Sequence, residues 1–192
     1  MTIEEIEKLL CVRLSEKRLH HVLCVRKQAL RLAKIYGADA GKAGLAALLH
    51  DITKEESLDR QLQKLQKSDI IFPEEILKTP PLYHAKTGML FARDELGIAD
   101  EDVLNAVSYH TTGRGGMSLL EKIIFVADAT SEERKYPGVK QLREQSYTDL
   151  DGTILALTIS TLQKVISVGS FLPMDTAACY NDCIRLQKNN KN

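Results

Sequence analysis

The chain has 192 residues, 44% of them hydrophobic and 27% charged, which is enough for one globular domain with a sizeable core. Its 26 basic and 26 acidic residues balance, so it lacks the basic footprint of a protein that binds a nucleic-acid polymer. No apolar run approaches the roughly 18 residues of a membrane span, and the first residues are acidic and unlike a signal peptide. We therefore expect a cytoplasmic protein without a membrane segment.

Apolar residues recur at helical spacing along almost the whole chain, and no segment alternates as a strand, which predicts an all-α fold. Residues typical of helix starts are Thr2 and Ser118, each with a glutamate three positions later, and Ser15, Asp39 and Asp100. The expected helices that begin at Thr2, Ser15, Asp39, Asp100 and Ser118 end near 12, 36, 51, 113 and 128, respectively. Further helices are expected over 58–68, 82–96, a short stretch after 138, 151–168, and from 176 onward. The prolines at 73, 80 and 81 break the pattern. We expect one domain over residues 1–192, with a tail that frays from about residue 187.

The cysteines carry little functional signal. Cys11, Cys24, Cys179 and Cys183 form no Cys-x-x-Cys pair, which in a chain without an export signal favours reduced thiols. Cys179 and Cys183 lie four residues apart on a predicted helix, so both could touch one metal ion. Because no further ligand lies near them in the sequence, we expect them to pack in the core.

Residues 45–54 are the most informative stretch. An almost wholly apolar run ends in His50 and Asp51, and Lys54 follows one helical turn later. A helix that is apolar on all sides belongs in a core. Two ligand-type side chains at its end would cost several kcal/mol unless they are paired or bind a cation. Imidazole and carboxylate together suit a divalent transition metal.

Other helices offer further ligands at or near inward faces. On the helix that follows Ser15, His21 lies at the edge of the apolar face, whereas His20 points to solvent. His110 continues the inward stripe of its helix, and Asp128 ends the apolar run 123–127. His84 shares a face with small and aromatic residues. Singly, each is more often a core or capping residue; together they indicate one shared metal site.

The ordered set His21, His50-Asp51, His84, His110 and Asp128 resembles the HD-domain metal-dependent phosphohydrolases, and more narrowly the YqeK family. Local matches are the segments 48–54 (Leu-Leu-His-Asp-Ile-Thr-Lys), 110–113 (His-Thr-Thr-Gly), 117–119, 127–128, Arg134 with 137–139, Thr176 and Asn181. The resemblance implies an all-α HD-domain helical bundle with a buried metal site. It also implies symmetrical hydrolysis of diadenosine tetraphosphate to two ADP, with iron as the expected metal.

By analogy with that fold, the metal ligands are His21, His50, Asp51 and Asp128. His84 and His110 either hold a second metal, with Asp51 bridging the two ions, or bind phosphate directly. The ligand types suit Fe, Mn, Co or Zn, with Mg a further candidate, and do not choose among them. A metal activates water for attack on phosphorus.

Asp51 and Lys54 are the expected catalytic residues, and Lys54 would add positive charge to the transition state. A solvated helix-end lysine is the alternative reading of Lys54. The expected substrate-binding residues are Arg18, Lys54, His84, His110, Thr111, Thr112, Arg114, Arg134, Phe171 and Thr176. Hydroxyls, guanidinium groups and the turn at Gly113 suit phosphates, and Phe171 offers a platform for a base. Packing of its loop against the core would explain Phe171 equally well.

Three other functions remain open at this level. The same fold could hydrolyse a deoxynucleotide or a cyclic dinucleotide. A non-catalytic nucleotide sensor could keep the fold, although such a chain would be expected to lose ligands and none is missing here. A structural helical adaptor could use the histidines as core residues. The expected partner is a dinucleoside polyphosphate or another small nucleotide, and a homodimer is possible.

Overall fold

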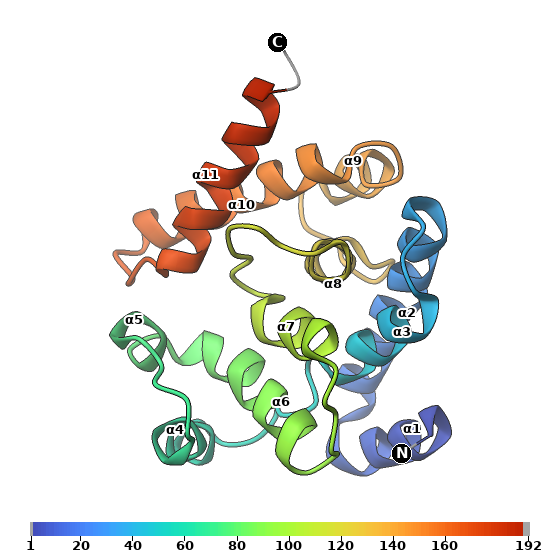
Figure 1. Cartoon of the computed structure of the whole chain (residues 1–192), viewed down its shortest axis with the longest axis vertical. Helices are drawn as coiled ribbons and strands as arrows, with labels where there is room; N and C mark the ends of the chain where they lie inside the picture. The colour runs from blue at the N-terminus through green and yellow to red at the C-terminus, as the bar shows by residue number, and fades with distance from the viewer. Residues whose placement is uncertain (1, 190–192) are drawn as a thin grey trace.

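The computed structural model describes residues 2–189, and this part of the chain consists of helices and loops without a strand (Figure 1). In chain order the helices are α1 (Ile3–Arg13), α2 (Glu16–Tyr36), α3 (Ala40–Leu49), α4 (Leu58–Lys67), α5 (Glu74–Leu77), the 3₁₀ turn η1 (Pro80–Leu82), α6 (Tyr83–Asp94), α7 (Glu101–Tyr109), α8 (Leu119–Thr130), α9 (Val139–Gln145), α10 (Leu150–Ser167) and α11 (Met174–Asn189). The predicted all-α class is confirmed.

Local capping signals set the starts of most helices. Both predicted capping boxes form, since the hydroxyls of Thr2 and Ser118 each accept a hydrogen bond from the backbone N–H three residues later. Ser15, Asp39 and Asp100 cap α2, α3 and α7 in the same way. The helices therefore begin where side-chain oxygens satisfy otherwise unpaired N–H groups.

Two predictions about helix limits were wrong. Helices α5 and η1 form across residues 74–82, where prolines predicted only breaks; proline is compatible with a first helical turn because its missing N–H is not needed there. Helix α11 begins at Met174, earlier than the predicted 176, and continues to Asn189, so residues 187–189 are not frayed. The rest of the expected frayed tail, 190–192, lies outside the described residues.

Helix α8 is the centre of the bundle. Its residues Ile123–Ala127 are all buried, and α2, α3, α7 and α10 pack around it, as its end-on position in Figure 1 shows. One hydrophobic cluster runs from Ile6 in α1 to Cys183 in α11. Within residues 2–189, no helix combines the length and the apolar character needed to cross a bilayer. The single-domain organisation stays a prediction.

Candidate metal centre and active site

Four histidines from four helices surround the carboxylate of Asp51. Asp51 directly follows His50, the C-cap of α3, and it is buried with a 4% exposed side chain. Its Oδ2 lies 3.5 Å from the Nε2 atoms of His21 and His50, and its Oδ1 lies 3.3 Å from Nε2 of His84 and 3.9 Å from Nε2 of His110. Each oxygen of one carboxylate thus faces its own pair of imidazoles.

Asp128, in the last turn of α8, completes the half of the cluster around His21. Its Oδ1 lies 3.1 Å from Nε2 of His21 and 4.0 Å from Nε2 of His50. Its side chain is 20% exposed, so solvent reaches the cluster on this side. Asp128, itself a predicted ligand, therefore lies close to the predicted ligands His21 and His50 and borders the open side of the site.

The histidine tautomers create the strongest argument for a cation. The Nδ1 atoms of His50 and His110 lie 2.7 Å from the carbonyl oxygens of Ala47 and Val107 and must donate to them. In the neutral ring the Nε2 atom then carries a lone pair, and both lone pairs face the carboxylate of Asp51. Buried acceptors that face one another are costly unless a proton or a metal ion lies between them.

Glu133 is a candidate functional residue that the sequence did not reveal. Its Oε1 lies 2.5 Å from Nδ1 of His21, so this carboxylate fixes the tautomer of a third imidazole and turns its Nε2 toward the two aspartates. A carboxylate behind a histidine is the usual support of a metal ligand. Glu133 lies in the charged loop after α8, where no helical periodicity marks one acidic residue over its neighbours.

The pKa values of the carboxylates show how they are ionised. Burial opposes ionisation of Asp51, but the nearby imidazoles of His50, His84 and His110 hold its pKa below the ordinary value. Burial also opposes ionisation of Asp128, whose pKa is nevertheless held low by its neighbours, foremost the hydrogen bond to His21. Both carboxylates are therefore negative at neutral pH, as metal coordination requires.

The imidazoles divide into two kinds. Burial alone would lower the pKa of His21, but hydrogen bonds with Asp128 and Glu133 raise it to about 9. Burial lowers the pKa of His110 to about 4 and lowers that of His84 as well. His84 and His110 are consequently neutral at pH 7, whereas His21 holds a proton that a metal ion would displace.

The donor set fits a divalent metal ion. Two groups of buried residues can each offer ligand atoms that lie within 4.8 Å of one another. One group is His21, His50 and Asp51, and the other is Asp51, His84 and His110. The Nε2 atoms within each pair are 3.3 and 3.2 Å apart. Ligands about 2.1 Å from one ion are spaced about 3 Å from each other, so this spacing suits a shared ion.

Three of the predicted cationic residues lie around this cluster. The Nζ atom of Lys54 is 3.1 Å from Nδ1 of His84, and its pKa is lowered by burial. Arg18 donates from Nη1 to Oδ2 of Asp51 at 2.7 Å, and Arg134 donates from Nε to the carbonyl oxygen of Asp128 at 2.8 Å and also to its carboxylate. The site therefore combines buried anions with a rim of positive charge.

The other predicted substrate contacts are less uniform. The hydroxyls of Thr111, Thr112 and Thr176 are buried without a hydrogen-bond partner among residues 2–189. Arg114 instead forms a pair with the buried carboxylate of Glu121, with Nε 2.6 Å from Oε1. Its role as a free phosphate ligand does not follow from this geometry.

Phe171 and His20 lie outside the cluster. Phe171 is 50% exposed on the loop between α10 and α11, so packing against the core does not explain it. His20 is exposed, as the helical periodicity predicted.

Cys179 and Cys183 are buried, and Sγ of Cys179 contacts the hydroxyl of Thr158 at 3.5 Å, in agreement with a packing role.

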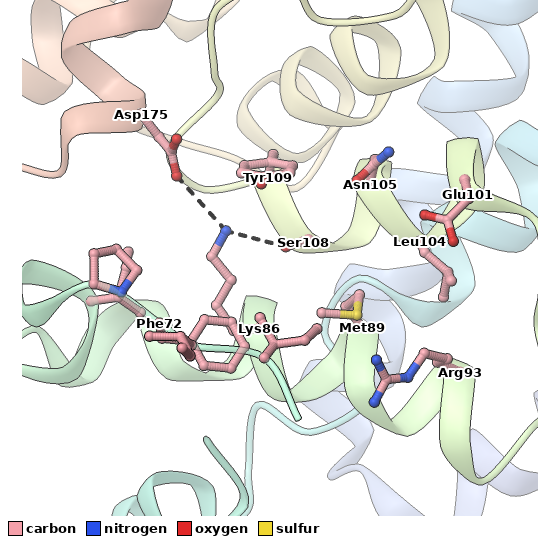
Figure 2. A pocket seen from close by; sticks show the side chains of 14 residues that line it. Phe72, Lys86, Met89, Arg93, Glu101, Leu104, Asn105, Ser108, Tyr109 and Asp175 are labelled. Carbon is pink, nitrogen blue, oxygen red and sulfur yellow. Dashed lines mark hydrogen bonds and ion pairs between the residues drawn. The ribbon is translucent and has the colours of Figure 1, made fainter. Parts of the chain in front are cut away.

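A separate cavity of about 300 Å³ lies on another side of α6 and α7 (Figure 2). Lys86 projects into it, two residues after His84 on α6 and therefore on a different face of the helix. Its ammonium donates to the hydroxyl of Ser108 at 3.1 Å and lies 4.0 Å from the carboxylate of Asp175. None of the residues around Asp51 lines this cavity, so it is distinct from the candidate metal centre.

Comparison with known proteins finds similarity over most of the chain. The model of the HD domain matches residues 18–133, more than half of the chain. A protein of Halalkalibacterium halodurans named "Bis(5'-nucleosyl)-tetraphosphatase, symmetrical" is 43% identical, over 91% of this chain and 93% of its own length. The Bacillus subtilis protein of the same name is 36% identical, over 91% and 95%.

A crystal structure from Clostridium acetobutylicum, described as a predicted HD superfamily hydrolase involved in NAD metabolism, superposes with a TM-score of 0.92. The two chains are 37% identical, and the match covers 96% of this chain and 98% of the other. Similarity therefore extends over nearly the full length in both sequence and structure. The chain belongs to the HD domain family.

Proposed function

We propose that this protein is a metal-dependent phosphohydrolase that cleaves diadenosine tetraphosphate symmetrically into two ADP. The observation that carries the proposal is the buried carboxylate of Asp51 between two pairs of imidazoles. The names of the relatives, which match nearly the whole chain, support the substrate. Four imidazoles gathered around one buried carboxylate are costly in an apolar core without a ligand, which argues against a structural adaptor.

His21, His50, Asp51 and Asp128 are the proposed ligands of the metal, with iron as the first candidate. When bound, such an ion lowers the pKa of a water ligand and neutralises charge on phosphate oxygens. His110 has the same fixed tautomer as His50 and is therefore suited to a second ion that Asp51 would share.

His84 differs from the other three, because its Nδ1 atom faces the ammonium of Lys54 instead of a carbonyl or carboxylate oxygen. The ammonium lies 3.1 Å from Nδ1 and 3.3 Å from Nε2 of His84, so it can donate to either nitrogen; when Nδ1 accepts, the ring carries its proton on Nε2 and can donate it. In this state His84 is suited to hold a phosphate oxygen, and Lys54 supports that role.

The cationic rim would bind and orient the polyphosphate. Three cationic side chains from three parts of the chain lie beside the cluster: Lys54, Arg18 and Arg134. Each can form an ion pair with a phosphate oxygen. In a partly buried site such contacts act in a lower effective dielectric than in water, so they stabilise the charge that moves to the leaving ADP. A cytoplasmic location and a homodimer stay predictions.

The test is a product analysis. Metal-reconstituted protein is incubated with dinucleoside polyphosphates, deoxynucleotides and cyclic dinucleotides, and the products are separated by chromatography. We expect diadenosine tetraphosphate to give two ADP, and its conversion to ATP and AMP would contradict the symmetrical reaction. His21→Ala should abolish activity, whereas His20→Ala provides a matched control on the exposed face of the same helix.

A further inference from the structure

Another cavity, with a volume of about 440 Å³, lies beside the loop that joins α8 to α9. Figure 1 shows that α9 and this loop lie next to the end of α8. Cavities of this size hold small organic ligands. Four cationic side chains and one carboxylate line the cavity: Arg134, Lys135, Lys140, Arg143 and Glu132.

The positive charge of this cavity is largely uncompensated. Glu132 accepts from Lys27 at 2.8 Å, so its charge is already matched by a residue outside the cavity. Lys135 and Lys140 are exposed, and neither forms an ion pair with any of residues 2–189. In a chain whose formal net charge is zero, this concentration of cations favours an anionic ligand.

Arg134 connects the cavity to the metal centre. It lines the cavity, and it donates to both the carbonyl and the carboxylate of Asp128. Arg143 holds the same loop in place, since its Nε and Nη2 atoms donate to the carbonyls of Thr130 and Ser131 at 2.5 and 2.6 Å. Arg134 is therefore shared by the cavity and the metal centre, and the loop that carries it is held in place.

Tyr136 supplies an aromatic surface in the cavity. Its hydroxyl donates to the carbonyl of Ala129 at 2.8 Å, which fixes the ring, and the residue remains 38% exposed. A fixed and partly exposed ring is suited to stack on a nucleobase, because every base has an apolar face. The cavity thus offers contacts to both phosphate and base.

We propose that this cavity binds the distal half of the substrate, the ADP portion that leaves, while the other half occupies the metal centre. The inference rests on the proposed function, since a dinucleoside tetraphosphate has two identical halves and only one can lie at the cluster. Lys135 and Lys140 would contact its phosphates, and Tyr136 would stack on its base. These side chains would determine the preference for dinucleoside substrates.

The test separates contacts to the base from contacts to phosphate. The KM for diadenosine tetraphosphate and the inhibition constant of inorganic tetraphosphate, which has no base, are measured at a fixed concentration of free metal. Tyr136→Leu should raise the KM at least about fivefold, the lower end of the contribution of base stacking, and leave the inhibition constant unchanged. Lys140→Gln should raise both constants.

Two controls account for folding and general charge. Tyr136→Phe removes the hydroxyl that holds the loop but keeps the ring, so its KM should rise less than that of Tyr136→Leu. Lys164→Gln neutralises an exposed lysine on α10, outside the cavity, and should change neither constant. Wild-type KM values in both Tyr136→Leu and Lys140→Gln would overturn the inference, as would an equal rise of both constants in Tyr136→Leu. If the wild-type protein does not cleave diadenosine tetraphosphate at all, the proposed function itself is wrong.

Discussion

Glu133→Gln tests whether a residue outside the metal ligands prepares the site. The carboxylate of Glu133 lies 2.5 Å from Nδ1 of His21 and fixes which nitrogen of this ring faces Asp51 and Asp128. Glutamine keeps the size of the side chain and can still accept a hydrogen bond, but it lacks the charge. We expect a weaker site with an unchanged set of ligands.

The magnitude follows from the hydrogen bond. A hydrogen bond to a charged group contributes about 1.5–3 kcal/mol net and a neutral one about 0.5–1.5 kcal/mol, so the substitution should cost about 1.4 kcal/mol. This corresponds to about a tenfold weaker affinity for the metal, at the lower end of the range for residues that support metal ligands. Since the side chain of Glu133 is only 20% exposed, solvent should not cancel the effect.

The assay is a competition titration of metal-free protein with a chelator of known affinity. Glu132→Gln is the matched control, because the neighbouring carboxylate pairs with Lys27 at the surface. Equal metal affinities for the two variants, or a wild-type affinity in Glu133→Gln, would refute the supporting role of Glu133.

Three further substitutions test other parts of the account. Lys54→Met should lower kcat/KM about 100-fold at unchanged metal content, because one charge donor to the phosphate is lost; retention of activity would exclude that role. Burial lowers the pKa of Lys86 from 10.5 to about 8. Between pH 8 and 10.5 the unfolded chain therefore binds more protons at this lysine than the folded chain does. The free energy of unfolding should rise with pH over this range, by at most about 3 kcal/mol. Urea denaturation of Lys86→Met should show a smaller rise. Gly113 has a positive φ, and Gly113→Ala would place a Cβ atom 2.8 Å from Sγ of Cys179. Gly116 also has a positive φ but no close neighbour, so Gly116→Ala should lower the free energy of unfolding by only about 1–2 kcal/mol. Gly113→Ala should cost more than this, and equal costs of the two variants in denaturation would contradict the reasoning.

Features governed by local sequence could be predicted. The capping box of Ser118 and Glu121 set the start of α8, and the periodicity of α2 separated the buried His21 from the exposed His20. Asp128 was recognised because a carboxylate directly after a long apolar run needs a partner. Such signals depend on residues one or two helical turns apart, which the sequence displays directly.

Features that depend on distant contacts could not be predicted. Glu133 meets His21 only because the end of α8 packs beside α2, and Glu121 was expected to cap its helix but also binds Arg114. Which imidazole keeps a free Nε2 atom depends on backbone carbonyls such as that of Ala47, whose direction no side-chain pattern reveals. The sequence therefore identified the candidate ligands but not the groups that orient them.

The central claim is that a divalent cation lies among the imidazoles and carboxylates around Asp51. Elemental analysis of purified wild-type protein and of Asp128→Ala, after incubation with iron or manganese and removal of excess metal, tests it most directly. We predict at least one equivalent of metal per wild-type chain and almost none in the variant. A wild-type chain that binds no metal, or a variant that retains full occupancy, would contradict the account.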